Sequence, residues 1–217
     1  MARAFLPEGN LLVAVLDDLE RTMVSGLMEQ TRILLSPDTE LTGDAFADLV
    51  ASMGVSLSAD QPTDDDATSG HPDPSAGFAD RDPALDRLLP TAHRGDDEIA
   101  AEFRRLTEEG LRQRKSANLD VALQQLAAAA DDRVVLDHAQ AAAFLMALTD
   151  VRLLLGERMG MRTEEDARAL HDAMETVADD DPLGYVMAWY DFLTWLQESL
   201  TQALMGDDPP FLAEGLP

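Results

Sequence analysis

The sequence predicts a mainly α fold: a helical bundle-like domain that begins with a small N-terminal β-hairpin. Apolar residues recur at helical spacing over most of the chain, which indicates amphipathic helices on a shared core. Two Asp-Pro pairs, at 82–83 and 181–182, are typical of helix starts, because Asp caps a helix and proline fits its first position. With 217 residues, of which 46% are apolar, the chain can form a single domain over 1–217 with a substantial core.

The first expected elements are two strands and a helix. Residues 3–6 and 11–15 are compatible with β structure and flank a turn that contains Pro and Gly, so they predict the hairpin. A helix is expected over about 17–35, where apolar residues repeat at helical spacing before Pro37. A weaker helix is expected at 43–53.

Residues 58–82 differ in composition from the rest of the chain. They hold seven acidic residues against one Arg, together with several Pro and Gly. Such a segment buries too little apolar surface to repay its ordering, so we expect an acidic flexible loop inside the domain. Its simplest interpretation is a solvated spacer, and the alternative is a regulatory or binding role.

The second half of the chain is predicted to be helical apart from one short strand. Asp96 begins a helix that either continues through Gly110 or breaks there before a second piece at 116–130. Residues 133–136 form an extended run that allows a third short strand beside the hairpin. The remaining helices are expected over 138–159, capped by Asp137 with Gln140 in the capping-box position, over 164–178 after Thr163, and over 182–205.

The last predicted helix, 182–205, has an unusually wide apolar face. On a helical wheel this face covers about 160° and includes Trp189 and Tyr190, whereas a surface helix usually has an apolar stripe nearer 100°. The helix is therefore either central in the bundle or shared with a partner. Trp195 falls on the opposite, polar side, where it either lies flat on a neighbouring helix or forms a dimer or partner contact. Trp195, Trp189 and Tyr190 are the candidate interface residues.

Charge and composition exclude several classes of function. The chain has 16 Lys and Arg against 42 Asp and Glu, a net charge of −26, which disfavours nucleic acid as a partner. The absence of Cys excludes a thiol nucleophile, a disulfide scaffold and a thiolate zinc site. The apolar runs are too short for a signal peptide or a membrane span, so we expect a cytoplasmic protein with no membrane partner.

One local cluster of basic residues runs against the overall charge. Arg104, Arg105, Arg112 and Lys115 fall within an arc of about 100° if 96–115 is one helix, which makes them a candidate anion or partner contact. Glu108 lies in the same arc, four residues from both Arg104 and Arg112, and can pair with either. The cluster is therefore either a salt-bridged structural face or a contact for phosphate or an acidic partner.

Arg152 lies at the edge of the apolar stripe of its helix, which predicts a structural ion pair with a carboxylate, because an unpaired buried charge is very costly. Asp150 is not that partner within the helix, since residues two apart point in different directions. The histidines lack the spacing of a helical metal site, apart from a weak His171–Glu175 pair, and we assign no metal, cofactor or catalytic residue.

Three stretches, 103–115, 147–160 and 185–204, together with the N-terminal block 11–35, resemble the actinobacterial domain-of-unknown-function 2017 family. The resemblance implies a transcriptional regulator, because family members commonly carry that label. One branch is an actinomycete oxidative stress regulator with a cysteine pair as sensor, which this chain lacks. The residues that match family positions, without a role attached, are Arg104, Arg105, Thr107, Asp150, Arg152, Gly156, Arg158, Tyr190, Trp195 and Gln197.

These observations favour a non-enzymatic intracellular regulator that acts through protein–protein contacts, with the transcription machinery as the expected partner and a homodimer as the expected state. One alternative is a direct DNA-binding regulator that uses the basic helix 104–115. The other is a small-molecule or metal-binding helical enzyme, for which the sequence has no recognisable motif.

Overall fold

The computed structural model describes residues 2–36, 82–90, 97–174 and 181–206. For residues 97–106 it describes the helical backbone and not the side chains. The expected helix at 43–53 and the expected acidic loop up to residue 81 lie outside the described residues. So do the ends of the chain and the predicted last turn of the 164–178 helix.

The described residues form six helices and three strands, which confirms the predicted mainly α domain with an N-terminal hairpin and a third short strand. In chain order they are β1 (Arg3–Glu8), β2 (Leu11–Val15), α1 (Asp18–Leu34), α3 (Pro83–Leu88), α4 (Asp97–Ala127), β3 (Arg133–Leu136), α5 (His138–Arg158), α6 (Glu164–Met174) and α7 (Pro182–Met205).

The sheet is antiparallel with the order β1-β2-β3. Gly9 has a φ of 65° in the turn between β1 and β2, a conformation that a residue without Cβ adopts at no steric cost. Leu12 pairs with Leu136 and Ala14 pairs with Val134, and all four side chains are buried on the same face. Alternation along the strands thus directs one face of the sheet into the helical core.

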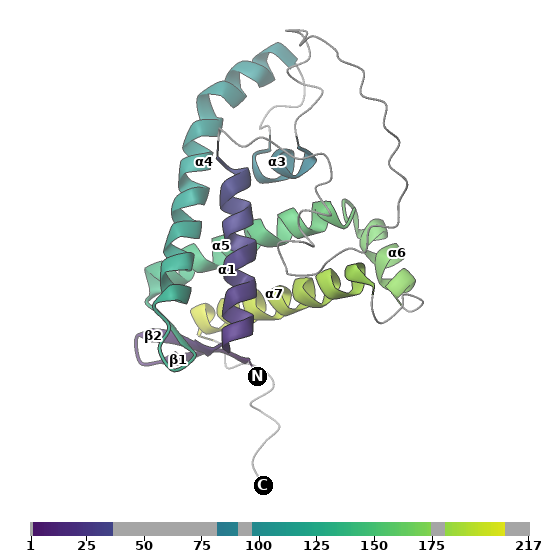
Figure 1. The fold of residues 1–217 in the computed structure, drawn as a ribbon. Helices are drawn as coiled ribbons and strands as arrows, with labels where there is room; N and C mark the ends of the chain where they lie inside the picture. The colour runs from purple at the N-terminus through teal and green to yellow at the C-terminus, as the bar shows by residue number, and fades with distance from the viewer. Residues whose placement is uncertain (1, 37–81, 91–96, 175–180, 207–217) are drawn as a thin grey trace, which may run out of the picture.

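Helix α5 is the centre of the fold and contacts α1, α3, α4 and α7 as well as β2 and β3 (Figure 1). Its N-terminus carries the predicted capping box, in which Asp137 and Gln140 bond each other's backbone N–H groups at 2.8 Å. By length and composition α5 could cross a membrane, but half of its apolar window is buried inside the fold. That burial is typical of the core helix of a water-soluble domain.

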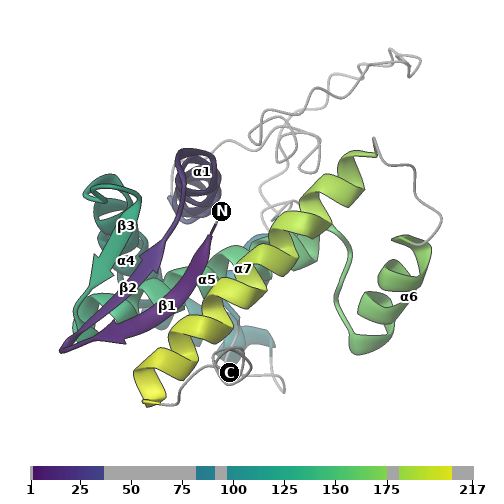
Figure 2. The same cartoon turned by 90° about the horizontal axis from the view of Figure 1, so that it is seen from below.

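The continuity of α4 and the two ends of α7 can be explained from local sequence. Helix α4 runs without a break through Gly110, which decides between the two predicted forms. Asp181 caps α7 ahead of Pro182, and Gly206 ends it in the left-handed conformation with a φ of 77°. Figure 2 shows the sheet and α6 at opposite ends of the fold. Helix α6 has no buried residue and meets the start of α7, where the Met174 methyl lies against Gly184.

Candidate functional site

Two cations of the predicted anion face on α4, Arg112 and Lys115, are paired with carboxylates of the same chain. Arg112 forms a salt bridge of 2.6 Å with Glu108, as its spacing predicted, and also donates to the backbone oxygen of Leu35 at 2.9 Å. Lys115 is 13% exposed and forms a salt bridge with Asp150 of α5. The side chains of Arg104 and Arg105 lie outside the described residues. Two of the four candidate contact residues therefore join α4 to its own neighbours.

The Lys115–Asp150 pair is the most deeply buried charge pair between α4 and α5. Asp150 is fully buried, and its Oδ2 atom has no hydrogen-bond partner among the described residues. Burial raises the pKa of the Asp150 carboxyl above its usual value, against the opposing effect of the Lys115 ammonium. Asp150 pairs with α4 whereas Arg152 bonds to α7, so the two are not partners, as the two-residue spacing predicted.

Arg152 bridges α5 and α7, but the expected carboxylate is not among its described partners. Its guanidinium donates to Gln197 Oε1 at 2.8 Å and to the Tyr190 hydroxyl at 3.3 Å, and its Cζ atom lies 5.1 Å from the centroid of the Tyr190 ring. The predicted ion pair is corrected to a hydrogen-bonded and cation–π contact. The reason is that α7 presents neutral acceptors, an amide and a phenol, at this position.

The network around Arg152 continues across the same two helices. Gln197 donates from Nε2 to Thr149 Oγ1 at 3.0 Å, and Thr149 in turn donates to the backbone oxygen of Leu145. Tyr190, predicted as an interface residue, is therefore used inside the fold. We call Arg152, Tyr190 and Gln197 the α5–α7 bracket. The Nε atom of Arg152 is buried without a hydrogen-bond partner among the described residues, so one donor of this bracket is unsatisfied.

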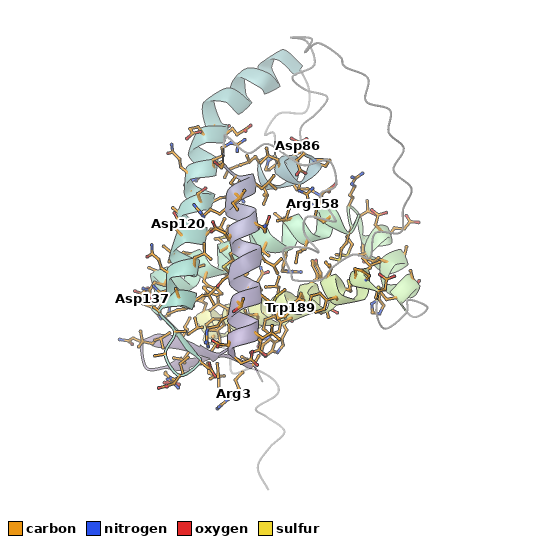
Figure 3. All side chains as sticks on the ribbon, viewed as in Figure 1. Arg3, Asp86, Asp120, Asp137, Arg158 and Trp189 are labelled. Carbon is orange, nitrogen blue, oxygen red and sulfur yellow. The ribbon has the colours of Figure 1, made fainter. Side chains whose placement is uncertain are left out.

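A row of aromatic rings follows one side of α7. Ring centroids are 6.4 Å apart for Tyr185 and Trp189, 5.3 Å for Trp189 and Phe192, and 5.7 Å for Phe192 and Trp195. These distances are within the range of favourable aromatic pairs. All four side chains are only partly buried at the edge of the core. We call Tyr185, Trp189, Phe192 and Trp195 the aromatic strip; Figure 3 labels Trp189.

The structure adds an intrahelical contact to those predicted for Trp195. The wheel places this side chain on the polar side of the helix, against a neighbouring helix or a partner. Its ring packs on Phe192 of its own helix, one turn away, and on the edge of the core, and it stays a candidate partner contact. The 4-3-3 spacing of the four aromatic positions is readable in the sequence and was the signal that could have found the strip.

A third network of charges, which the sequence did not reveal, fixes α3 on the C-terminal end of α5. Asp82 caps α3 through the Ala84 N–H at 2.8 Å and accepts two hydrogen bonds from Arg158, which Figure 3 labels. Glu157 accepts from Arg87 at 3.1 Å and from Arg162 at 2.8 Å. The Arg158–Asp82 and Arg87–Glu157 pairs join residues that are 70 or more positions apart, so no local spacing could predict them. The Arg162–Glu157 pair is local.

A family model named Domain of unknown function (DUF2017) matches residues 2–204, nearly the whole chain and every described element. The chain belongs to the DUF2017 family. No curated protein and no solved structure matches it. Family membership supports the resemblance seen in the sequence and carries no function with it.

The structure places several of the DUF2017 positions named from the resemblance in the three networks. Asp150 is in the α4–α5 pair, Arg152, Tyr190 and Gln197 form the α5–α7 bracket, and Arg158 holds α3. Trp195 lies in the aromatic strip. In the described ranges of this DUF2017 chain, no group of three His, Asp or Glu side chains is placed to hold a metal ion.

Proposed function

We propose that this DUF2017 chain is a non-enzymatic, cytoplasmic regulator that acts through protein–protein contacts, with the transcription machinery as the expected partner. One observation carries the proposal: both tryptophans and both tyrosines of the chain lie in α7, and the aromatic strip leaves part of each of its rings in water. Trp and Tyr are the side chains that contribute most to binding energy at protein interfaces.

The charge distribution supports a protein partner over DNA. A DNA-binding surface needs cations that displace counterions from phosphates, and the chain carries a net −26. On α4, Arg112 and Lys115 are held by Glu108 and Asp150. Removing Lys115 from Asp150 would leave a fully buried carboxylate without its counter-charge, which is costly.

A pull-down from a lysate of the native host, with and without nuclease, tests the proposal. We expect partners that survive nuclease, including a polymerase subunit, a sigma factor or another regulator. Recovery that depends wholly on nucleic acid would contradict it and favour the DNA-binding alternative. In that case, binding of purified protein to DNA should weaken steeply with salt and disappear in the Arg104→Ala/Arg112→Ala double variant.

The homodimer predicted through apolar surface on or near α7 stays a prediction. Size-exclusion chromatography with light scattering tests it directly. A dimer mass is expected at high micromolar concentration, and a monomer mass there would contradict it.

A further inference from the structure

We propose that the occupant of the aromatic strip is an amphipathic helix of a partner protein, with an apolar stripe for the rings and Arg or Lys along its flank. This inference rests on the proposed function and adds the chemistry of the partner. It follows from the length of the strip, from the charge beside it, and from what the rest of the chain does with its cations.

The strip has the dimensions of a helix-docking surface. From Tyr185 to Trp195 it covers eleven residues, about 15 Å at the rise of an α-helix, which matches about three turns of a helix laid along it. Partner helices are recognised through anchors spaced three or four residues apart, and the rings here have that spacing. Ala188 is exposed beside the rings and its small side chain allows close approach.

The edge of the strip is acidic. Asp191 and Glu198 are exposed, and on a wheel they fall with Ala188 and Trp195 within an arc of about 80°. Helix α7 contains no Lys, Arg or His. The rings and carboxylates therefore form one apolar stripe with a negative border, which is complementary to a helix with an apolar stripe and a positive border.

Arg152, a described cation in contact with α7, lies on the other flank of the helix, where Tyr190 and Gln197 hold it. It is therefore not placed to neutralise Asp191 and Glu198 at the border of the strip.

A second copy of the chain fits the strip less well than a basic helix. It would bring a further net charge of −26 to an acidic border, and like charges across an interface cost binding energy. A homodimer has other apolar surface available, such as Leu11 and Val135, which are exposed on the outer side of the sheet.

The protein carries its own reporter for the test, because both of its tryptophans, Trp189 and Trp195, lie in the strip. The probe is a synthetic 18-residue helical peptide without Trp or Tyr, with Leu along one stripe and Arg along its flanks. Two further peptides serve as comparisons: a scramble of the same composition, and a version with Glu in place of each Arg. Tryptophan emission of the full chain is titrated with each.

We expect the basic amphipathic peptide to shift tryptophan emission to the blue and to bind at least tenfold tighter than its scramble, with no binding of the Glu version. The exposed pair Asp191→Asn/Glu198→Gln should weaken binding at least fivefold. Phe192→Ala, which keeps both tryptophans, should weaken it at least tenfold. The matched control Asp120→Asn/Glu109→Gln on α4 removes the same charge from exposed positions and should change affinity less than twofold.

Three results would overturn the inference: equal binding of the peptide and its scramble, equal effects of the two charge-removing pairs, or binding without a change in emission. A loss of dimer mass in Trp195→Ala would also overturn it, because a second copy would then be the occupant. If the peptide does not bind but nuclease-resistant partners still disappear in Trp195→Ala, the proposed function stands and the basic helix is wrong.

Discussion

Helices α4 and α7 both stand out in the sequence as surfaces for a partner, one by its basic residues and one by its aromatic residues. The structure treats them differently. Arg112 and Lys115 of α4 are paired with Glu108 and Asp150, so their charge holds the fold together. The rings of the aromatic strip on α7 remain partly in water.

The difference teaches how to weigh such surfaces in a very acidic chain. Arg112 and Lys115 each find a carboxylate inside their own molecule, so a basic cluster in such a sequence is weak support for a binding site. A carboxylate of the same chain can neutralise a cation, but it cannot cover the exposed part of an aromatic ring at the edge of the core. Contiguous apolar surface that remains in water often marks an interaction site.

The largest expected effect tests whether α4 is committed to the fold. Asp150→Ala leaves the Lys115 ammonium largely buried without its counter-charge, and we expect the free energy of unfolding to fall by about 3–5 kcal/mol. Urea denaturation followed by circular dichroism measures it. An unchanged value would mean that Lys115 is available to a partner after all.

Two variants control that measurement. Lys115→Met/Asp150→Leu replaces the pair by apolar side chains of similar size and should restore most of the lost stability. Asp120→Ala, at an exposed position on the same helix, should change stability by less than about 0.5 kcal/mol.

Within α7, truncation of the buried Leu196 should lower the free energy of unfolding more than truncation of its partly exposed neighbour Trp195. Leu196 is fully buried, so Leu196→Ala should cost about 2–5 kcal/mol of unfolding free energy. Trp195→Ala should cost only about 1–2 kcal/mol, because part of the ring is already in water. Equal costs in thermal or urea unfolding would place Trp195 in the core and remove it from the aromatic strip.

The network that joins α3 to α5 is a third region, in which the cation Arg158 pairs with Asp82 of the same chain. Asp82→Asn keeps the cap on the Ala84 N–H but loses the charge that faces Arg158, so it should cost about 2 kcal/mol of unfolding free energy. Asp82→Ala should cost about 1 kcal/mol more, because the cap is lost as well. If the two variants were equally stable, the cap would contribute nothing.

The pH dependence of the Asp82→Asn effect isolates the charge. Burial raises the pKa of Asp82, but the hydrogen bonds from Arg158 and the Ala84 N–H outweigh it, and the folded pKa lies below the ordinary value of 3.8. A depressed folded pKa gives stability above the unfolded pKa that is lost as pH falls through the folded value. The advantage of the wild type over Asp82→Asn should be full at neutral pH and shrink below 3.8.

The smallest expected effect concerns the opposite flank of α7. Arg152→Lys keeps the charge but loses the second hydrogen bond and the planar contact with Tyr190, which should cost about 1 kcal/mol of unfolding free energy. Recovery of partners in a pull-down should not change. Loss of partners with this variant would move the contact from the aromatic strip to the Arg152 flank.

Local chemistry in the sequence was sufficient for the elements and insufficient for the contacts between them. The Asp137 capping box, the Asp181–Pro182 start and the strand at 133–136 depend on neighbours within a few residues, and all three predictions are confirmed. The Lys115–Asp150 pair depends on how α4 packs on α5, which no spacing in the sequence reveals.

The partner type of Arg152 and the ring contact of Trp195 escaped prediction for different physical reasons. The position of Arg152 at the edge of the apolar stripe was read correctly, but the type of its partner depends on which residues of α7 face it. For Trp195, the wheel separates polar from apolar sides and does not include a ring of the same helix one turn away. The expected acidic loop and the helix at 43–53 lie outside the described residues and remain predictions.

The most direct test of the central claim is one pull-down, with nuclease throughout, that compares wild type, Trp195→Ala and Arg104→Ala/Arg112→Ala under conditions where all three are folded. The claim that the aromatic strip of α7 binds the partner predicts that Trp195→Ala loses the partners and the α4 variant keeps them. The opposite pattern, with partners lost from the α4 variant and retained by Trp195→Ala, would contradict it.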